Sequence, residues 1–229
     1  PDEVYTLGRV GYAARLAMEL GVDIGSTSTK AVLMDTEHCI LAGFYTRTAG
    51  RPIQAAQAIC AAIDDMIQKK DIQLTIIGAG TTGSGRKLIG KIIGADMVID
   101  EITSHACAAV NINPRVDTII EIGGQDAKFT TLQNGQVTFS IMNTVCAAGT
   151  GSFIEEQAQK LGCPLDEFSN RTENQRSPLA SDRCTVFMEQ DVERLVRLGH
   201  SPAEALAAVM YSVVENYLAK VVGNRSYSR

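Results

Sequence analysis

The sequence has 229 residues, with 21 Lys and Arg against 26 Asp and Glu, so its formal net charge at pH 7 is −5. Hydrophobic residues make up 45% and charged residues 21%, a composition that excludes a disordered chain and is typical of globular domains. The mild acidity argues against nucleic acid or an anionic membrane surface as a partner, and no apolar run reaches the roughly 18–20 residues that span a bilayer.

The N-terminus lacks the basic, apolar and small-residue order of a signal peptide, so we expect a cytoplasmic protein. In such a chain, the six cysteines are better interpreted as thiols or metal ligands than as a disulfide framework. No CxxC pair occurs, so the usual zinc-ribbon and thioredoxin patterns are absent from the sequence.

The first half of the chain predicts strands followed by helices. Residues 1–17 match neither strand alternation nor a capped helix, and we predict a linker or the tail of an upstream module over 1–19. Apolar β-formers then flank the turn DIGSTSTK, and a third strand follows at 40–46. Isoleucines at helical spacing predict a helix over 53–67, with Cys60 on its apolar face. Further on we predict a strand at 74–77, a helix at 86–93, a strand at 97–99 and a helix at 103–110.

The second half repeats the opening pattern of strand, glycine turn and strand. The predicted strands are 116–122, 129–132 and 137–142, with EIGGQDAK as the first turn and Asn134-Gly135 as a hairpin turn. DIGSTSTK and EIGGQDAK align as acid-Ile-Gly, four residues and Lys. Helices follow at about 150–161, 185–198 and 202–222, and Ser201, Pro202 and Glu204 form a capping signature for the last. We therefore predict an α/β chain of two duplicated lobes, 20–112 and 113–229.

Both glycine turns suit phosphate binding, because small residues let backbone N–H groups approach phosphate oxygens. The candidate phosphate-binding residues are Gly25, Ser26, Thr27, Lys30, Gly123 and Gly124. Asp23 and Glu121 suit Mg²⁺ held largely through water. The alternative for a single turn is a tight hairpin with solvated lysines. Two equivalent turns in one chain favour phosphate binding.

A GxGxxG pattern at Gly78–Gly83 offers a second interpretation, because it follows a predicted strand and precedes a predicted helix. Asp100, at the end of the next strand, could serve as the acidic partner of a dinucleotide site. The antiparallel hairpins that follow argue against this interpretation. The P-loop pattern also fails, because Gly80–Lys87 gives GxxxxGRK.

Cys146 and Cys184 each directly precede a predicted helix. Unpaired N–H groups and partial positive charge at a helix N-terminus lower a thiol pKa and stabilise an anionic metal–thiolate centre. The alternative is that both are buried structural cysteines. The three histidines are too scattered for a metal site, and His105 is either a ligand contact or a structural residue.

Six motifs in this order resemble one known family: DIGSTSTK, GTTGSGR, TSHACAA, EIGGQDAK, MNTVCAAGTGSF and CTVFMEQDV. They are similar to the BadF/BadG/BcrA/BcrD ATPases that activate 2-hydroxyacyl-CoA dehydratases and benzoyl-CoA reductases. The resemblance implies the actin-like fold of acetate and sugar kinases, ATP with Mg²⁺ at the two glycine turns, and Cys146 and Cys184 as cluster ligands. Two identical subunits would then supply four thiolates to one 4Fe-4S cluster of a homodimer.

The implied activity is ATP-gated electron transfer, with Gln125 or Asp126 orienting the water that attacks ATP. A ferredoxin or flavodoxin would reduce the cluster, and a CoA-ester dehydratase or reductase would receive one low-potential electron. The family continues past this C-terminus to an adenosine-binding loop, so we expect an incomplete second lobe and weak ATP binding. Two alternatives stay open: a small-molecule kinase of the same fold without a cluster, and a non-catalytic module of a larger protein.

Overall fold

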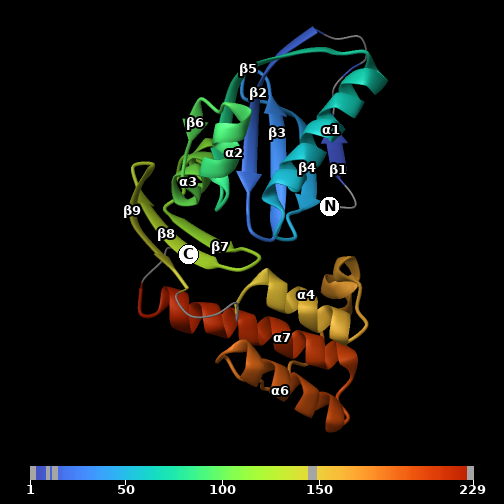
Figure 1. Cartoon of the computed structure of the whole chain (residues 1–229). Helices are drawn as coiled ribbons and strands as arrows, with labels where there is room; N and C mark the ends of the chain where they lie inside the picture. Colours follow the sequence, from blue (N-terminus) through green and yellow to red (C-terminus); the bar gives the residue numbers. More distant parts are fainter. Residues whose placement is uncertain (1–3, 9–10, 12–14, 144–148, 226–229) are drawn as a thin grey trace. The chain divides into compact units, whose positions relative to one another are not determined.

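The computed structural model describes residues 4–8, 11, 15–143 and 149–225 (Figure 1). The chain divides into two compact units, Pro1–Ala108 and Ala109–Arg229. This division falls within helix α3 (Glu101–Ile112), whereas the sequence analysis divides the lobes directly after that helix.

Within the described residues, the first unit contains a six-stranded mixed sheet of order β1-β4-β3-β2-β5-β6. Its strands are β1 (Tyr5–Gly8), β2 (Arg15–Ile24), β3 (Ser28–Met34), β4 (Ile40–Arg47), β5 (Gln73–Thr82) and β6 (Met97–Val98). The first four are paired antiparallel, which confirms the predicted meander of β2, β3 and β4. β5 pairs in parallel with β2, and β6 pairs in parallel with β5.

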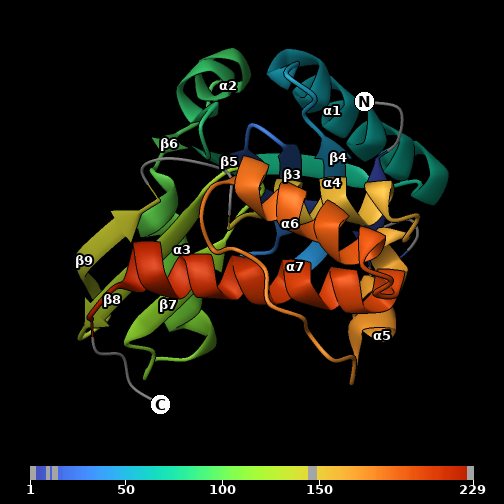
Figure 2. The same ribbon diagram turned by 90° about the horizontal axis from the view of Figure 1, so that it is seen from below.

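Helices α1 (Pro52–Lys70) and α2 (Arg86–Ile93) cover the same face of this sheet (Figures 1 and 2). The predicted isoleucine stripe accounts for the packing, since Ile59 and Ile63 of α1 join Leu33 and Phe44 in one buried cluster with Ile89 of α2. The helix predicted at 86–93 is α2, with the same bounds.

The described part of the second unit contains a three-stranded antiparallel sheet of order β7-β8-β9. Its strands are β7 (Thr118–Ile122), β8 (Ala127–Gln133) and β9 (Gln136–Met142). Asn134 and Gly135 join the last two with φ values of 51° and 77°, the left-handed pair that a two-residue type I′ hairpin requires. The hairpin prediction is therefore confirmed.

After this sheet, the described residues form the helices α4 (Gly151–Lys160), η1 (Leu165–Glu167), α5 (Phe168–Thr172), α6 (Thr185–Arg197), α7 (Pro202–Tyr217) and the π-helical turn η2 (Leu218–Val222). α7 lies between α4 and α6 (Figure 1) and shares one buried cluster with both, in which Phe153, Met188 and Val209 meet. The predicted capping box of Ser201 and Glu204 is present. η2 packs Val221 and Val222 against Phe129 of β8, so one continuous helical segment joins the helices to the sheet.

By length and hydropathy, Pro202–Val222 passes the test for a membrane span, although 61% of the window tested is buried inside the protein. This is the helix predicted at 202–222, and polar residues such as Glu204 and Ser212 interrupt its apolar run. Core helices of soluble proteins pass the same test, so a single such helix is weak evidence for a membrane protein.

Three local predictions are wrong. Tyr5–Gly8 forms a strand and β2 begins at Arg15, because the open edge of β4 pairs with a segment that has no local strand signal. β5 extends to Thr82, so Gly78 and Gly80 lie within a strand opposite Glu19 and Gly21. Cys60, predicted on the apolar face of α1, is exposed. Each residue of a helix points about 100° from the one before it, so Cys60 points away from the buried Ile59 and lines a groove with Asp64.

Candidate functional site

The first glycine turn joins β2 to β3 and is closed by a hydrogen bond from the Gly25 amide to the Ser28 carbonyl, 3.0 Å long. A Cβ on Gly25 would lie 2.9 Å from that carbonyl oxygen, so glycine is required by close backbone approach. Ser26 is exposed at the turn and Thr27 is partly buried. Asp23 and Lys30 face each other across the two strands.

The second glycine turn, between β7 and β8, has the same construction. The Gly123 amide donates to the Asp126 carbonyl at 2.8 Å, and a Cβ on Gly123 would lie 3.0 Å from that oxygen. Glu121 and Lys128 are register partners, as Asp23 and Lys30 are in the first unit. The aligned motifs therefore correspond to two turns built alike, one in each unit.

Each turn holds its lysine on its acid. Lys30 Nζ lies 3.2 Å from Asp23 Oδ2. Lys128 Nζ lies 3.1 Å from both Glu121 Oε1 and Asp126 Oδ1. Lys128 is only 4% exposed, so the solvated-lysine interpretation is wrong for the second turn. The carboxylates are the hard oxygen donors that Mg²⁺ prefers, and this donor set fits a cation that keeps much of its water.

The first turn is also held by Thr48, which directly follows β4 and carries no motif in the sequence. Thr48 Oγ1 donates to the Gly25 carbonyl at 2.7 Å and shares a 2.9 Å hydrogen bond with Thr29 Oγ1. The Thr48 amide donates to the Thr27 carbonyl at 2.9 Å. Thr48 and Thr29 are buried, so these bonds hold the turn in place before any ligand arrives.

The GTTGSGR segment also contacts the first turn. Gly83 has a φ of 86°, and a Cβ there would overlap Asp23 Oδ1 and the Ile24 carbonyl. The Gly85 amide donates to the Ile24 carbonyl at 2.9 Å. These glycines therefore permit close packing against Asp23, and the extension of β5 through Gly80 removes the turn that a dinucleotide fingerprint needs.

An open cleft of about 280 Å³ lies beside the first turn. Its lining includes Asp23 and Lys30, together with Thr82 and Ser104, whose hydroxyls share a 3.0 Å hydrogen bond. The acid–lysine pair is therefore accessible to a ligand from within the first unit.

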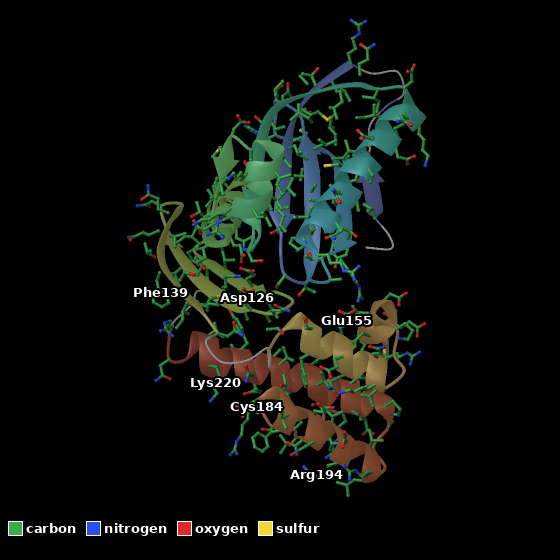
Figure 3. All side chains as sticks on the ribbon, in the orientation of Figure 1. Asp126, Phe139, Glu155, Cys184, Arg194 and Lys220 are labelled. Atoms are coloured by element: carbon green, nitrogen blue, oxygen red, sulfur yellow. The ribbon has the colours of Figure 1, made fainter. Side chains whose placement is uncertain are left out.

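The second turn has partners on α4 and α7. The Gly151 and Ser152 amides at the start of α4 donate to the Gly123 and Gly124 carbonyls at 2.8 and 3.0 Å. Tyr217 Oη of α7 donates to the Lys128 carbonyl at 2.9 Å. Burial, with a smaller contribution from the Glu121 charge, raises the pKa of Tyr217 to about 12. Gln125 is exposed at the turn, whereas Asp126 is bound by Lys128 (Asp126 is labelled in Figure 3).

Cys184 is the N-cap residue of α6, with extended backbone angles of φ −86° and ψ 162° (Figure 3). Its carbonyl accepts hydrogen bonds from the Phe187 and Met188 amides at 3.0 and 3.1 Å. The thiol is free, partly exposed, and makes no capping hydrogen bond to the described first turn of α6. A thiolate at this helix N-terminus fits the donor chemistry of an iron–sulfur cluster. Cys146 lies outside the described residues.

A family model for the BadF/BadG/BcrA/BcrD ATPases matches residues 20–225. The chain belongs to this family. It is therefore an ATPase, and both the family and the enzyme class expected from the motifs are confirmed.

Members with assigned roles are similar over most of the chain. The activator of lactoyl-CoA dehydratase from Anaerotignum propionicum is 35% identical over 198 residues, which are 85% of this chain and 73% of that protein. The solved activator of 2-hydroxyisocaproyl-CoA dehydratase from Clostridium difficile, with bound ADPNP, matches with a TM-score of 0.77 and 29% identity. That match covers 91% of this chain and 77% of the other.

A more distant structure agrees on the fold alone. The ROK family glucokinase from Streptomyces griseus matches with a TM-score of 0.51 and 13% identity, over 89% of this chain and 77% of the other. The predicted actin-like and sugar-kinase ATPase fold is therefore confirmed.

Proposed function

We propose that this ATPase is an activator that passes a low-potential electron to a partner enzyme acting on a CoA ester, either a 2-hydroxyacyl-CoA dehydratase or a related reductase. The observation that carries the proposal is Cys184 at the N-terminus of α6, in the unit that also contains an acid–lysine glycine turn. The names of the similar activators support the choice of partner.

In this proposal each glycine turn contributes to binding MgATP. Asp23 and Glu121 organise Mg²⁺ largely through water, and the turn amides with Ser26 and Thr27 bind phosphate oxygens. The exposed Gln125 is the better candidate for orienting the attacking water, because Asp126 is engaged by Lys128. Lys30 and Lys128 offset the negative charge of these carboxylates, which would otherwise repel the phosphates.

Cys146 and Cys184 are proposed as the ligands of a 4Fe-4S cluster. Two thiols per chain supply half of a four-cysteine site, so a homodimer would complete it. The bound cluster supplies one-electron redox chemistry: a ferredoxin or flavodoxin loses one electron, and the partner enzyme gains it. ATP hydrolysis can drive this step only if the nucleotide states favour different conformations of the protein. A cytoplasmic location belongs to the same proposal.

The test is the iron and sulfide content of anaerobically purified protein, measured with its visible spectrum. We expect a broad thiolate–iron absorption, which Cys184→Ser abolishes. Cys60→Ser is the matched control, because Cys60 is an exposed thiol on α1 of the first unit. Full iron content in the Cys184→Ser variant would rule out the ligand assignment. A chain that never binds iron but hydrolyses ATP would favour the kinase alternative.

A further inference from the structure

The side chain of Asn216, near the end of α7, holds the backbone that leads into Cys184. Its Nδ2 donates to the carbonyl oxygens of Asp182 at 2.5 Å and of Arg183 at 2.9 Å. Asn216 is only 8% exposed, so both bonds are shielded from water. They fix the two peptide units immediately before the N-cap of α6.

The same side chain also contacts the segment that follows Cys146. A Cβ on Gly149 would lie 2.8 Å from Asn216 Oδ1, so glycine permits the chain to pass closely over this amide. Gly149 is buried. One side chain of α7 therefore lies between the segment entering Cys184 and a residue three positions after Cys146.

The next residue, Tyr217, contacts the glycine turn of the same unit. Its hydroxyl donates to the Lys128 carbonyl at 2.9 Å, and its ring packs in a buried cluster with Ala127 and Phe129 of β8. Lys128 in turn holds Glu121 and Asp126 through its ammonium group. Tyr217 is thus bonded to the residue whose side chain organises the acids of the turn.

Adjacent residues point about 100° apart on an α-helix, so α7 can contact two sites with two neighbouring side chains. Directly after Tyr217 the winding changes to the π-helical turn η2. Such turns are rare and are found frequently at functional sites. The hydrogen bond of Tyr217 therefore ties the glycine turn to α7 at the point where its helical winding changes.

We propose that Asn216 and Tyr217 are positioning residues that couple the nucleotide state of the second glycine turn to the backbone around Cys184. This inference rests on the proposed function, which places the nucleotide at the turn and the cluster at Cys184. The link has two hydrogen-bonded parts joined by the covalent backbone. The Lys128 ammonium holds Glu121 and Asp126, and the Lys128 carbonyl accepts from Tyr217. The neighbouring Asn216 then donates to the two carbonyls before Cys184.

The test uses hydrogen exchange of the full chain, read over residues 181–188, with and without MgADPNP. Tyr217→Phe removes only the hydroxyl, and Tyr211→Phe, on the exposed side of the same helix, is its control. Asn216→Ala removes the amide, and Ser212→Ala, also buried on α7, is the control. Nucleotide affinity and iron content are measured on every variant.

We expect MgADPNP to change exchange over 181–188 in the wild type and in both controls. Tyr217→Phe should lose most of that change while its nucleotide affinity stays within about threefold. Asn216→Ala should speed exchange there by about tenfold even without nucleotide, because two hydrogen bonds that resist local opening are gone. A full nucleotide response in Tyr217→Phe, or none in the wild type, would overturn the inference. Because the exchange assay also works on iron-free protein, missing iron counts against the proposed cluster alone.

Discussion

At the scale of single residues, the two acid–lysine pairs are chemically alike but differ in burial. Lys30 and Asp23 are both partly exposed, whereas the Lys128 side chain is 5% exposed and holds two carboxylates. An exposed ion pair contributes little net stability, while removal of one partner from a buried set leaves uncompensated charge. The second turn should therefore depend far more on its lysine.

We predict that Lys128→Met lowers the free energy of unfolding by about 2–4 kcal/mol, a value reduced from the fully buried case because Asp126 is partly exposed. Lys30→Met is the matched control and should cost less than about 1 kcal/mol. Urea unfolding of the three proteins measures both. Equal losses would mean that burial does not distinguish the two turns.

Tyr217 gives a prediction for alkaline pH. Its pKa is raised from 10.0 to about 12 in the folded chain, so between these values the unfolded chain has already lost the proton that the folded chain keeps. The stability contributed by protonated Tyr217 is therefore complete below pH 10 and is lost as pH rises towards 12. Unfolding free energies measured across this range should fall less steeply in Tyr217→Phe than in the wild type. The same slope in both would show that the hydroxyl titrates normally.

At the scale of elements, short-range patterns predict local structure and miss the contacts that define the site. The isoleucine spacing of α1, the capping box of α7 and the Asn134-Gly135 hairpin involve neighbours in sequence, and each is found as expected. The hydrogen bond from Tyr217 to Lys128 joins residues 89 positions apart, and Thr48 reaches Gly25 from 23 positions away. No local pattern encodes such pairs, because packing of whole elements creates them.

The same reasoning applies to the GxGxxG glycines, for which the predicted antiparallel hairpins already argue against a dinucleotide site. Gly78 and Gly80 resemble a phosphate loop in sequence, yet β5 carries them in parallel beside β2. Gly83 has the positive φ and the close backbone approach that a dinucleotide fingerprint requires, but the group that it approaches is Asp23. The GxGxxG motif therefore indicates a constrained backbone at Gly83. Whether that backbone binds a dinucleotide depends on the sheet order, which the motif does not contain.

The turns themselves give the prediction at this scale. Gly25→Ala places a methyl group against the Ser28 carbonyl, so it should cost about 1–3 kcal/mol of stability and weaken ATPase activity at least tenfold. Gly43→Ala on β4 has open space around the added methyl and should be nearly neutral. Steady-state ATPase assays and thermal unfolding test the pair. A Gly25→Ala protein as active and stable as Gly43→Ala would remove the turn from the site.

At the scale of the whole molecule, each unit provides one glycine turn, and the second also provides Cys184 and the helix that joins Cys184 to its turn. This distribution gives the two units different tasks in the proposed activator. The second unit would both sense nucleotide and hold the cluster ligands. Because one chain has two candidate cysteine ligands, the proposed electron-transfer activity belongs to a pair of chains.

Native mass spectrometry under strictly anaerobic conditions tests this central claim most directly, because it measures subunit number and cluster content on the same particle. The proposal predicts two chains of 24.6 kDa carrying one 4Fe-4S cluster, and cluster-free chains for Cys184→Ser. A single chain that carries a complete cluster, or a dimer that carries one cluster in each subunit, would contradict it.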